Sequence, residues 1–186
     1  MNKLFAMLMV LVLALCCVPA MAEDSAPEEA PEVLEYKLES VESYMLSPDH
    51  EGAYVEYTTP AFKFWVPSPM EQGGMTQEMV DADCIDYFVA ADMPQYNIVV
   101  RNLDYDGLVD SIETLQEMAP SVWPDSRSAT VNGVKAVVAV QNDGDAMTVI
   151  LPDGNGKFVE INYNGYSDKD FVPDVGISIA SIQFEG

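Results

Sequence analysis

The chain has 186 residues and combines a large apolar content with a strongly acidic charge balance. It carries 31 Asp and Glu against 8 Lys and Arg, for a formal net charge of −23, and 49% of its residues are hydrophobic. Such a charge excludes nucleic acid and anionic lipid surfaces as partners, since both would be repelled. The apolar content and the length suit one domain with its own core.

Residues 1–22 have the pattern of a cleavable export signal. Lys3 gives a short positive start, Leu4 to Val18 form an apolar run, and Ala20-Met21-Ala22 supplies the small residues that a signal peptidase requires. The run is too short to span a bilayer comfortably. We expect the mature protein to begin near Glu23, to have no stable membrane span after cleavage, and to be periplasmic, envelope-associated or extracellular.

Residues 23–45 are predicted to be an acidic, Pro-containing tail or linker. Its charge is high and its apolar groups are few, so ordering it would not repay the entropy lost. Pro27 and Pro31 break regular structure early. We expect disorder to about Glu35 and a loosely attached strand or helix around Val41 to Met45.

Residues 46–186 are predicted to form a single domain. Phe62 to Val66 alternate between apolar and polar positions, which is typical of a half-buried strand. Met70 to Gln77 contains two glycines and is interpreted as a loop. Cys84–Val89 and Tyr96–Arg101 are expected to form a hairpin.

A helix is predicted over Gly107–Ala119, capped by Asp106 and ended by Pro120. Its apolar face is expected to consist of Leu108, Ile112, Leu115 and Ala119. Further strands are expected at Ser128–Val131, Val134–Val140, Ala146–Leu151 and Phe158–Tyr163. The turn Asn132-Gly133 is a strong hairpin signal because both residues tolerate positive φ.

The last helix is predicted over Asp168–Ala180. Ser167 and Asp170 have the spacing of a capping box, and Pro173 falls in the first turn, where its missing N–H is tolerated. The apolar stripe of this helix consists of Phe171, Val175, Ile179 and Ile182. Taken together, these elements predict an α+β fold, an antiparallel sheet with segregated helices.

This order of elements resembles the PsbP-like fold family, which includes the extrinsic photosystem II protein, Ran-binding relatives and exported bacterial proteins. Three segments carry the resemblance, together with the central helix: Phe62-Lys63-Phe64-Trp65-Val66-Pro67, Ala129-Thr130-Val131-Asn132-Gly133-Val134-Lys135-Ala136 and Ile177-Ser178-Ile179-Ala180-Ser181-Ile182-Gln183-Phe184. The resemblance covers roughly Ala53 to Phe184. It implies a non-catalytic domain that docks onto a larger assembly, and it transfers no functional residue, because a fold does not determine a function.

No catalytic constellation stands out, and we predict neither enzymatic activity nor a cofactor. Cys16 and Cys17 leave with the signal, so Cys84 is the one remaining thiol, and its alternating apolar surroundings favour a small buried side chain. The only histidine, His50, is interpreted as a solvated linker residue. A hydrolase stays an alternative that would need an acidic cleft flanked by aromatic side chains.

Two Asp-Gly turns provide candidate ligands for a divalent cation such as calcium. The candidates are Asp143, Asp145, Asp153 and Asn155. Oxygen ligands of this kind suit calcium, but the residues that follow Asp153 do not match the EF-hand pattern. Asp and Gly are also ordinary turn formers. A cation-responsive module is therefore the alternative function.

The primary hypothesis is an exported binding or accessory domain that docks onto an envelope or extracellular protein. Met70, Met75 and Met79 lie in or beside a glycine-containing loop, and methionine adapts to varied apolar surfaces. Together with Trp123 they are candidates for an exposed partner-binding patch. The alternative interpretation of these four side chains is ordinary core filling.

Overall fold

The computed structural model describes residues 33–184 except 46, 48–50, 60, 61 and 106. The predicted export signal, His50 and the predicted helix cap Asp106 therefore lie outside the described residues. Within the described part, no helix is long and apolar enough to cross a membrane.

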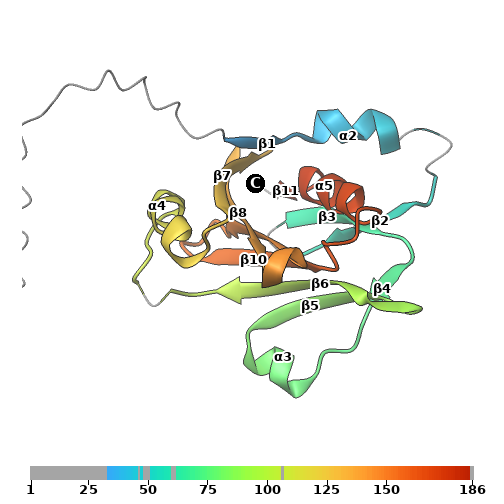
Figure 1. The fold of residues 1–186 in the computed structure, drawn as a ribbon, viewed down its shortest axis with the longest axis horizontal. Helices are drawn as coiled ribbons and strands as arrows, with labels where there is room; N and C mark the ends of the chain where they lie inside the picture. The colour runs from blue at the N-terminus through green and yellow to red at the C-terminus, as the bar shows by residue number, and fades with distance from the viewer. Residues whose placement is uncertain (1–32, 46, 48–50, 60–61, 106, 185–186) are drawn as a thin grey trace, which may run out of the picture. The chain divides into compact units, whose positions relative to one another are not determined.

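The described strands form one large sheet and one small sheet (Figure 1). The large sheet has the order β1 (Leu34–Tyr36), β7 (Ser126–Val131), β8 (Val134–Gln141), β9 (Ala146–Pro152), β10 (Phe158–Asn164), β6 (Met93–Leu103), β5 (Cys84–Ala90) and β4 (Met70–Gln72). β1 pairs parallel to β7, and every other pairing in this sheet is antiparallel. The small antiparallel sheet has the order β11 (Gln183–Phe184), β3 (Phe62–Pro67) and β2 (Tyr54–Thr58).

The helices of the described chain accompany these sheets. They are α2 (Leu38–Met45), α3 (Gln77–Asp81), α4 (Ile112–Val122) and α5 (Val172–Ala180), with a short 3₁₀ turn η2 (Asn142–Gly144) between β8 and β9. α5 contacts β3 of the small sheet and also contacts α2, whereas α4 contacts β7 and β8 of the large sheet. This arrangement confirms the predicted α+β fold class.

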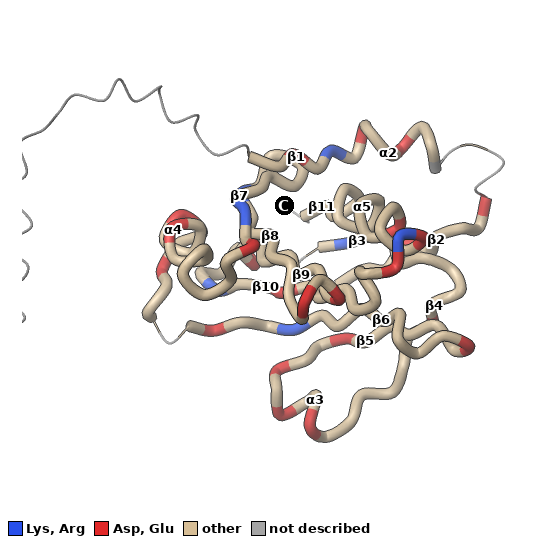
Figure 2. Tube along the Cα trace, in the orientation of Figure 1, with Lys and Arg blue, Asp and Glu red and all other residues tan. Residues whose placement is uncertain are grey.

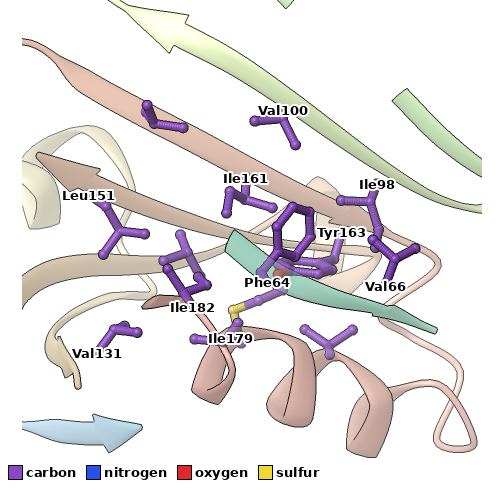
Figure 3. Packing of buried hydrophobic residues seen from close by; sticks show 14 of the residues in the cluster. Phe64, Val66, Ile98, Val100, Val131, Leu151, Ile161, Tyr163, Ile179 and Ile182 are labelled. Carbon is purple, nitrogen blue, oxygen red and sulfur yellow. The ribbon is translucent and has the colours of Figure 1, made fainter. Parts of the chain in front are cut away.

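The main core lies between the large sheet, the small sheet and α5. Figure 3 shows side chains from β3, β6, β10 and α5 gathered in one cluster, with Phe64, Tyr163 and Ile179 among them. The strand alternation explains this placement, because Val159, Ile161 and Tyr163 face the cluster from one side of β10. Each fully buried side chain of this size contributes about 1.5–3 kcal/mol to folding.

A second cluster lies on the opposite face of the large sheet. Ile112, Leu115 and Ala119 of α4 pack there against a group of strand side chains. This group consists of Val137, Ile150 and Phe158. Since α4 covers one face and the main core the other, β9 is buried on both faces along nearly its whole length.

Several strands confirm the sequence predictions. β3 buries Phe62, Phe64 and Val66. The β7–β8 hairpin turns through Asn132-Gly133 with positive φ at both residues. The hairpin of β5 and β6 also forms, and its strands extend to Ala90 and Met93, so its turn is shorter than predicted.

The central helix begins later than predicted and ends later. The Ser111 hydroxyl accepts a hydrogen bond from the Thr114 N–H at 3.2 Å and caps α4. Leu108 therefore lies outside the helix and is 80% exposed, instead of facing the core. Pro120 is accommodated within the last turn, and the helix continues to Val122.

The last helix also begins later, at Val172, and lacks a side-chain cap. Ser167 donates to the Asp145 carboxylate at 2.5 Å, and the Asp168 carboxylate accepts the Asp170 N–H at 2.9 Å. The predicted capping box therefore does not form, because these side chains stabilise a turn before the helix. The predicted apolar stripe is buried as expected.

Segments interpreted as tail or loop also contain regular structure. Leu34–Tyr36 forms β1 beside β7, although disorder is expected to about Glu35. The helix α2 covers the segment around Val41 to Met45, where a strand or helix is expected, and begins earlier, at Leu38. Met70–Gln72 forms β4 within the predicted loop. The short strands β1 and β4 are stabilised by pairing with the longer strands β7 and β5, and α2 contacts α5; local composition does not predict these contacts.

Candidate functional site

A cavity of about 450 Å³ opens where three connections of the chain meet. The turn from β3 to β4, the hairpin end of β5 and β6, and the segment that leads into α5 form its walls. Its polar lining consists of Ser68, Tyr96, Asp168, Asp170 and Asp174. Its apolar lining consists of Pro67, Pro69, Met70, Ala90, Met93 and Phe171. We call this cavity the acidic pocket.

Two tyrosines hold two of the three pocket carboxylates in place. The Tyr96 hydroxyl donates to Asp168, and the Tyr54 hydroxyl donates to Asp174. The pKa of Asp168 is held below its ordinary value, first by the hydrogen bond from Tyr96 and then by the one from the Asp170 N–H. Burial, followed by the bond to Asp174, raises the pKa of Tyr54. The tyrosines therefore stay protonated donors.

The rest of the pocket wall is mainly apolar. The Tyr96 and Phe171 rings lie with centroids 5.2 Å apart, and both contact the main core. Met70 is buried at one side, while Met93 is 42% exposed at the hairpin end. The pocket thus combines an apolar wall with carboxylates fixed by hydrogen bonds.

The charge of the acidic pocket is one-sided. None of its lining residues is basic. The five ion pairs among the described residues involve none of its carboxylates. Figure 2 shows how far acidic positions outnumber basic ones along the described chain. A cation with an apolar body matches both parts of the lining.

The structure does not bring the four predicted cation ligands together into one site. The Asp153 carboxylate accepts the Asn155 and Lys157 N–H groups at 2.7 and 2.9 Å, so it stabilises its own turn. Asp145 accepts from Ser167, and Asp143 is exposed with φ of 56°. Within the described part of the chain, no three His, Cys, Asp or Glu residues lie close enough to hold a metal ion.

The predicted partner-binding residues are separated as well. Met70 is buried and lines the acidic pocket, whereas Met75 is 40% exposed and Met79 is half-buried on α3. Trp123 packs against the second cluster. It also lines a hollow of about 510 Å³ that it shares with the predicted cation ligand Asp143.

Sequence reasoning missed the acidic pocket apart from Met70. Its one local signal is the group of three Asp residues at 168, 170 and 174, whose positions fit the predicted last helix and its capping box. The other walls come from the β3–β4 turn and the β5–β6 hairpin. No local pattern predicts that these turns meet.

No protein-family profile and no curated protein matches this chain. A solution structure of cyanobacterial PsbP from Synechocystis is similar to it, with a TM-score of 0.48 and 10% identity, over 72% of this chain and 93% of that one. A crystal structure from Bacteroides thetaiotaomicron matches at a TM-score of 0.48 and 11% identity, over 70% of this chain. The match covers 48% of that chain. A PsbP is among these similar structures.

Proposed function

We propose that this protein is an exported, non-enzymatic binding domain that docks onto an envelope or extracellular protein. In this proposal, the acidic pocket holds a lysine or arginine side chain of the partner. One observation carries the proposal: three aspartates and an apolar wall share one cavity that has no basic lining residue.

The chemistry of a basic side chain matches this lining. Lysine and arginine carry a cation at the end of an apolar stem, and the stem prefers an apolar surface while the cation prefers carboxylates. Pro67, Met70 and Phe171 offer the surface, and Asp168, Asp170 and Asp174 offer the carboxylates.

Two further properties support binding over catalysis. The hydrogen bonds from Tyr54 and Tyr96 orient carboxylates before any partner arrives, which lowers the ordering cost of binding. The net charge of −23 attracts basic surfaces at long range and increases their association rate.

The test uses n-butylammonium as a mimic of the lysine side chain, with n-butanol as its uncharged counterpart. Both are titrated into the purified protein and followed by amide chemical shifts in ¹H–¹⁵N NMR spectra. We expect saturable shifts at Met70, Met93 and Phe171 with butylammonium alone. The double variant Asp170→Asn, Asp174→Asn should lose them.

A matched control separates the pocket from the overall charge. The double variant Glu78→Gln, Glu117→Gln removes two exposed helix carboxylates at a distance from the pocket and changes the net charge equally. We expect it to bind butylammonium as the unmodified protein does. If both double variants lose the shifts alike, the overall field attracts the cation and the proposal is wrong.

A further inference from the structure

A second cavity lies on the side of the large sheet where β1 joins β7. Its volume is about 580 Å³, and it shares no lining residue with the acidic pocket. Its walls come from β1, from the segment that enters β7, from β8 and β9, and from Tyr166 after β10. We call it the Arg127 hollow.

Arg127 differs from most basic side chains of the described chain. Five of them form ion pairs with acids: Lys37, Lys63, Arg101, Lys135 and Lys157. Arg127 lines the hollow and forms no ion pair with any described residue, although the chain contains 31 acidic residues. Its guanidinium is therefore available to a ligand at this place.

Other hydrogen-bond donors without protein partners surround the same hollow. The hydroxyls of Tyr36 and Tyr166 form no hydrogen bond within the described chain. Burial raises the pKa of Tyr36 most, the nearby Tyr166 raises it further, and the nearby Arg127 lowers it. Tyr36, Tyr166 and Arg127 therefore lie near one another in the hollow.

The remaining wall is apolar. Leu34 and Val140 are half-buried, while Val138 and Met147 belong to the main core and are almost fully buried. A ligand in this hollow would meet unpaired donors at one part of the wall and an aliphatic surface at the other. Asp125 also lines the hollow, so a ligand with several negative charges would be repelled.

From this combination we infer that the Arg127 hollow binds a small monocarboxylate with an apolar body. The carboxylate accepts hydrogen bonds from the planar guanidinium of Arg127, a geometry that favours bidentate pairing. The hydroxyls of Tyr36 and Tyr166 supply further donors. A free organic acid and the C-terminus of a peptide offer the same chemistry.

The test distinguishes these two sources with four probes. Octanoate and octan-1-ol differ only in the carboxylate, and an N-acetylated tripeptide ending in leucine is used as the free acid and as the amide. Binding to the purified protein is followed by amide shifts of Leu34, Val140 and Tyr166 in ¹H–¹⁵N NMR spectra. Saturation by octanoate and not by octanol supports a free acid. Saturation by the peptide acid and not by its amide supports a C-terminus.

Two variants test the role assigned to Arg127. Arg127→Gln should weaken binding of the carboxylate probe at least about tenfold, and the fold should persist because no described residue pairs with this side chain. Lys169→Gln removes an equal charge outside the hollow and should leave the affinity unchanged. The inference is overturned if no carboxylate saturates the protein below about 10 mM, if the neutral probes bind equally, or if both variants weaken binding alike.

Discussion

At the scale of single residues, one ion pair joins two central strands of the large sheet. Arg101 of β6 lies opposite Glu160 of β10, and its guanidinium donates to the Glu160 carboxylate. The Glu160 side chain is only 3% exposed, whereas the Arg101 side chain is 42% exposed. The two partners therefore depend on the pair to different degrees, because only Arg101 retains access to water.

This asymmetry predicts unequal effects of two neutralising substitutions. Arg101→Gln leaves a buried carboxylate without its cation and should lower the free energy of unfolding by about 3–5 kcal/mol. Glu160→Gln should cost less, because water can solvate Arg101. Urea denaturation at neutral pH measures both. Lys63→Gln, which breaks the more exposed pair with Glu56, should cost no more than about 1 kcal/mol. Equal losses for Arg101→Gln and Glu160→Gln would contradict the burial argument.

A pH effect is expected at Asp168 in the acidic pocket. The Tyr96 hydroxyl and the Asp170 N–H stabilise its ionised form and hold its pKa below the ordinary value of 3.8. A depressed pKa in the folded state adds stability above the unfolded pKa, and this stability is lost as the pH falls through the folded pKa. The loss of this stability is therefore confined to acidic solution, below about pH 4.

Removing the Tyr96 hydroxyl should raise this pKa. We expect Tyr96→Phe to shift the titration of the Asp168 carboxyl carbon, followed by ¹³C NMR, toward its ordinary midpoint. Tyr57→Phe removes a similar hydroxyl that donates to Asp86 and should leave Asp168 unchanged. An unaltered Asp168 titration in Tyr96→Phe would show that the tyrosine does not stabilise this carboxylate.

At the scale of elements, the β7–β8 turn also connects distant segments. The Asn132 side-chain oxygen accepts the Leu38 N–H at 2.7 Å, where β1 leads into α2. Its amide nitrogen donates to the carbonyls of Ala180 and Ile182 at 2.9 and 2.6 Å, at the end of α5. Asn132 adopts φ of 48°, a conformation that asparagine tolerates. One turn residue thus joins three segments.

Replacing Asn132 with glycine separates the turn from these contacts. Asn132→Gly keeps the positive φ and removes the three side-chain hydrogen bonds, so we expect a loss of about 1.5–4 kcal/mol in unfolding free energy. Hydrogen exchange at the Leu38 amide should accelerate. Asn142→Gly is the matched control, because Asn142 has φ of 54° and no side-chain hydrogen bond to a described residue. Similar losses in both variants would rule out the connecting role.

At the scale of the whole molecule, the charge of −23 determines how ions act on stability. Like charges repel one another in the folded chain, and salt screens this repulsion. The alternative function, a cation-responsive module, requires a calcium-specific effect at Asp143, Asp145, Asp153 and Asn155. Asp153 already accepts two backbone N–H groups of its own turn. We therefore expect screening alone.

Melting temperatures with chelator, calcium and magnesium at matched ionic strength test this expectation. Screening predicts small and equal rises for both cations. A specific site saturated at about a hundred times its dissociation constant would add roughly 2.7 kcal/mol for calcium alone. A calcium-specific rise that disappears after alanine substitution at the four candidates would favour the cation-responsive module over screening.

Features that depend on neighbours along the chain could be predicted from the sequence. Local periodicity and turn chemistry predict the strand alternation from Phe62 to Val66, the Asn132-Gly133 turn and the apolar stripe of α5. These features together predict the α+β class. The residue type of Ser111 is also compatible with a helix cap at the start of α4. The sequence offers Asp106 as a second residue of suitable type, so the residue types alone do not decide between the two.

Which surfaces come together depends on the packing of the folded chain. Asp168 and Met70 share the acidic pocket, and Arg127 and Tyr166 share the hollow, although sequence separates the members of each pair. Leu34–Tyr36 becomes a strand because β7 offers it an edge. Such contacts are set by how sheets and helices pack. A local sequence pattern does not indicate which distant segment will pack beside it. The candidate sites can therefore be identified only in the folded chain.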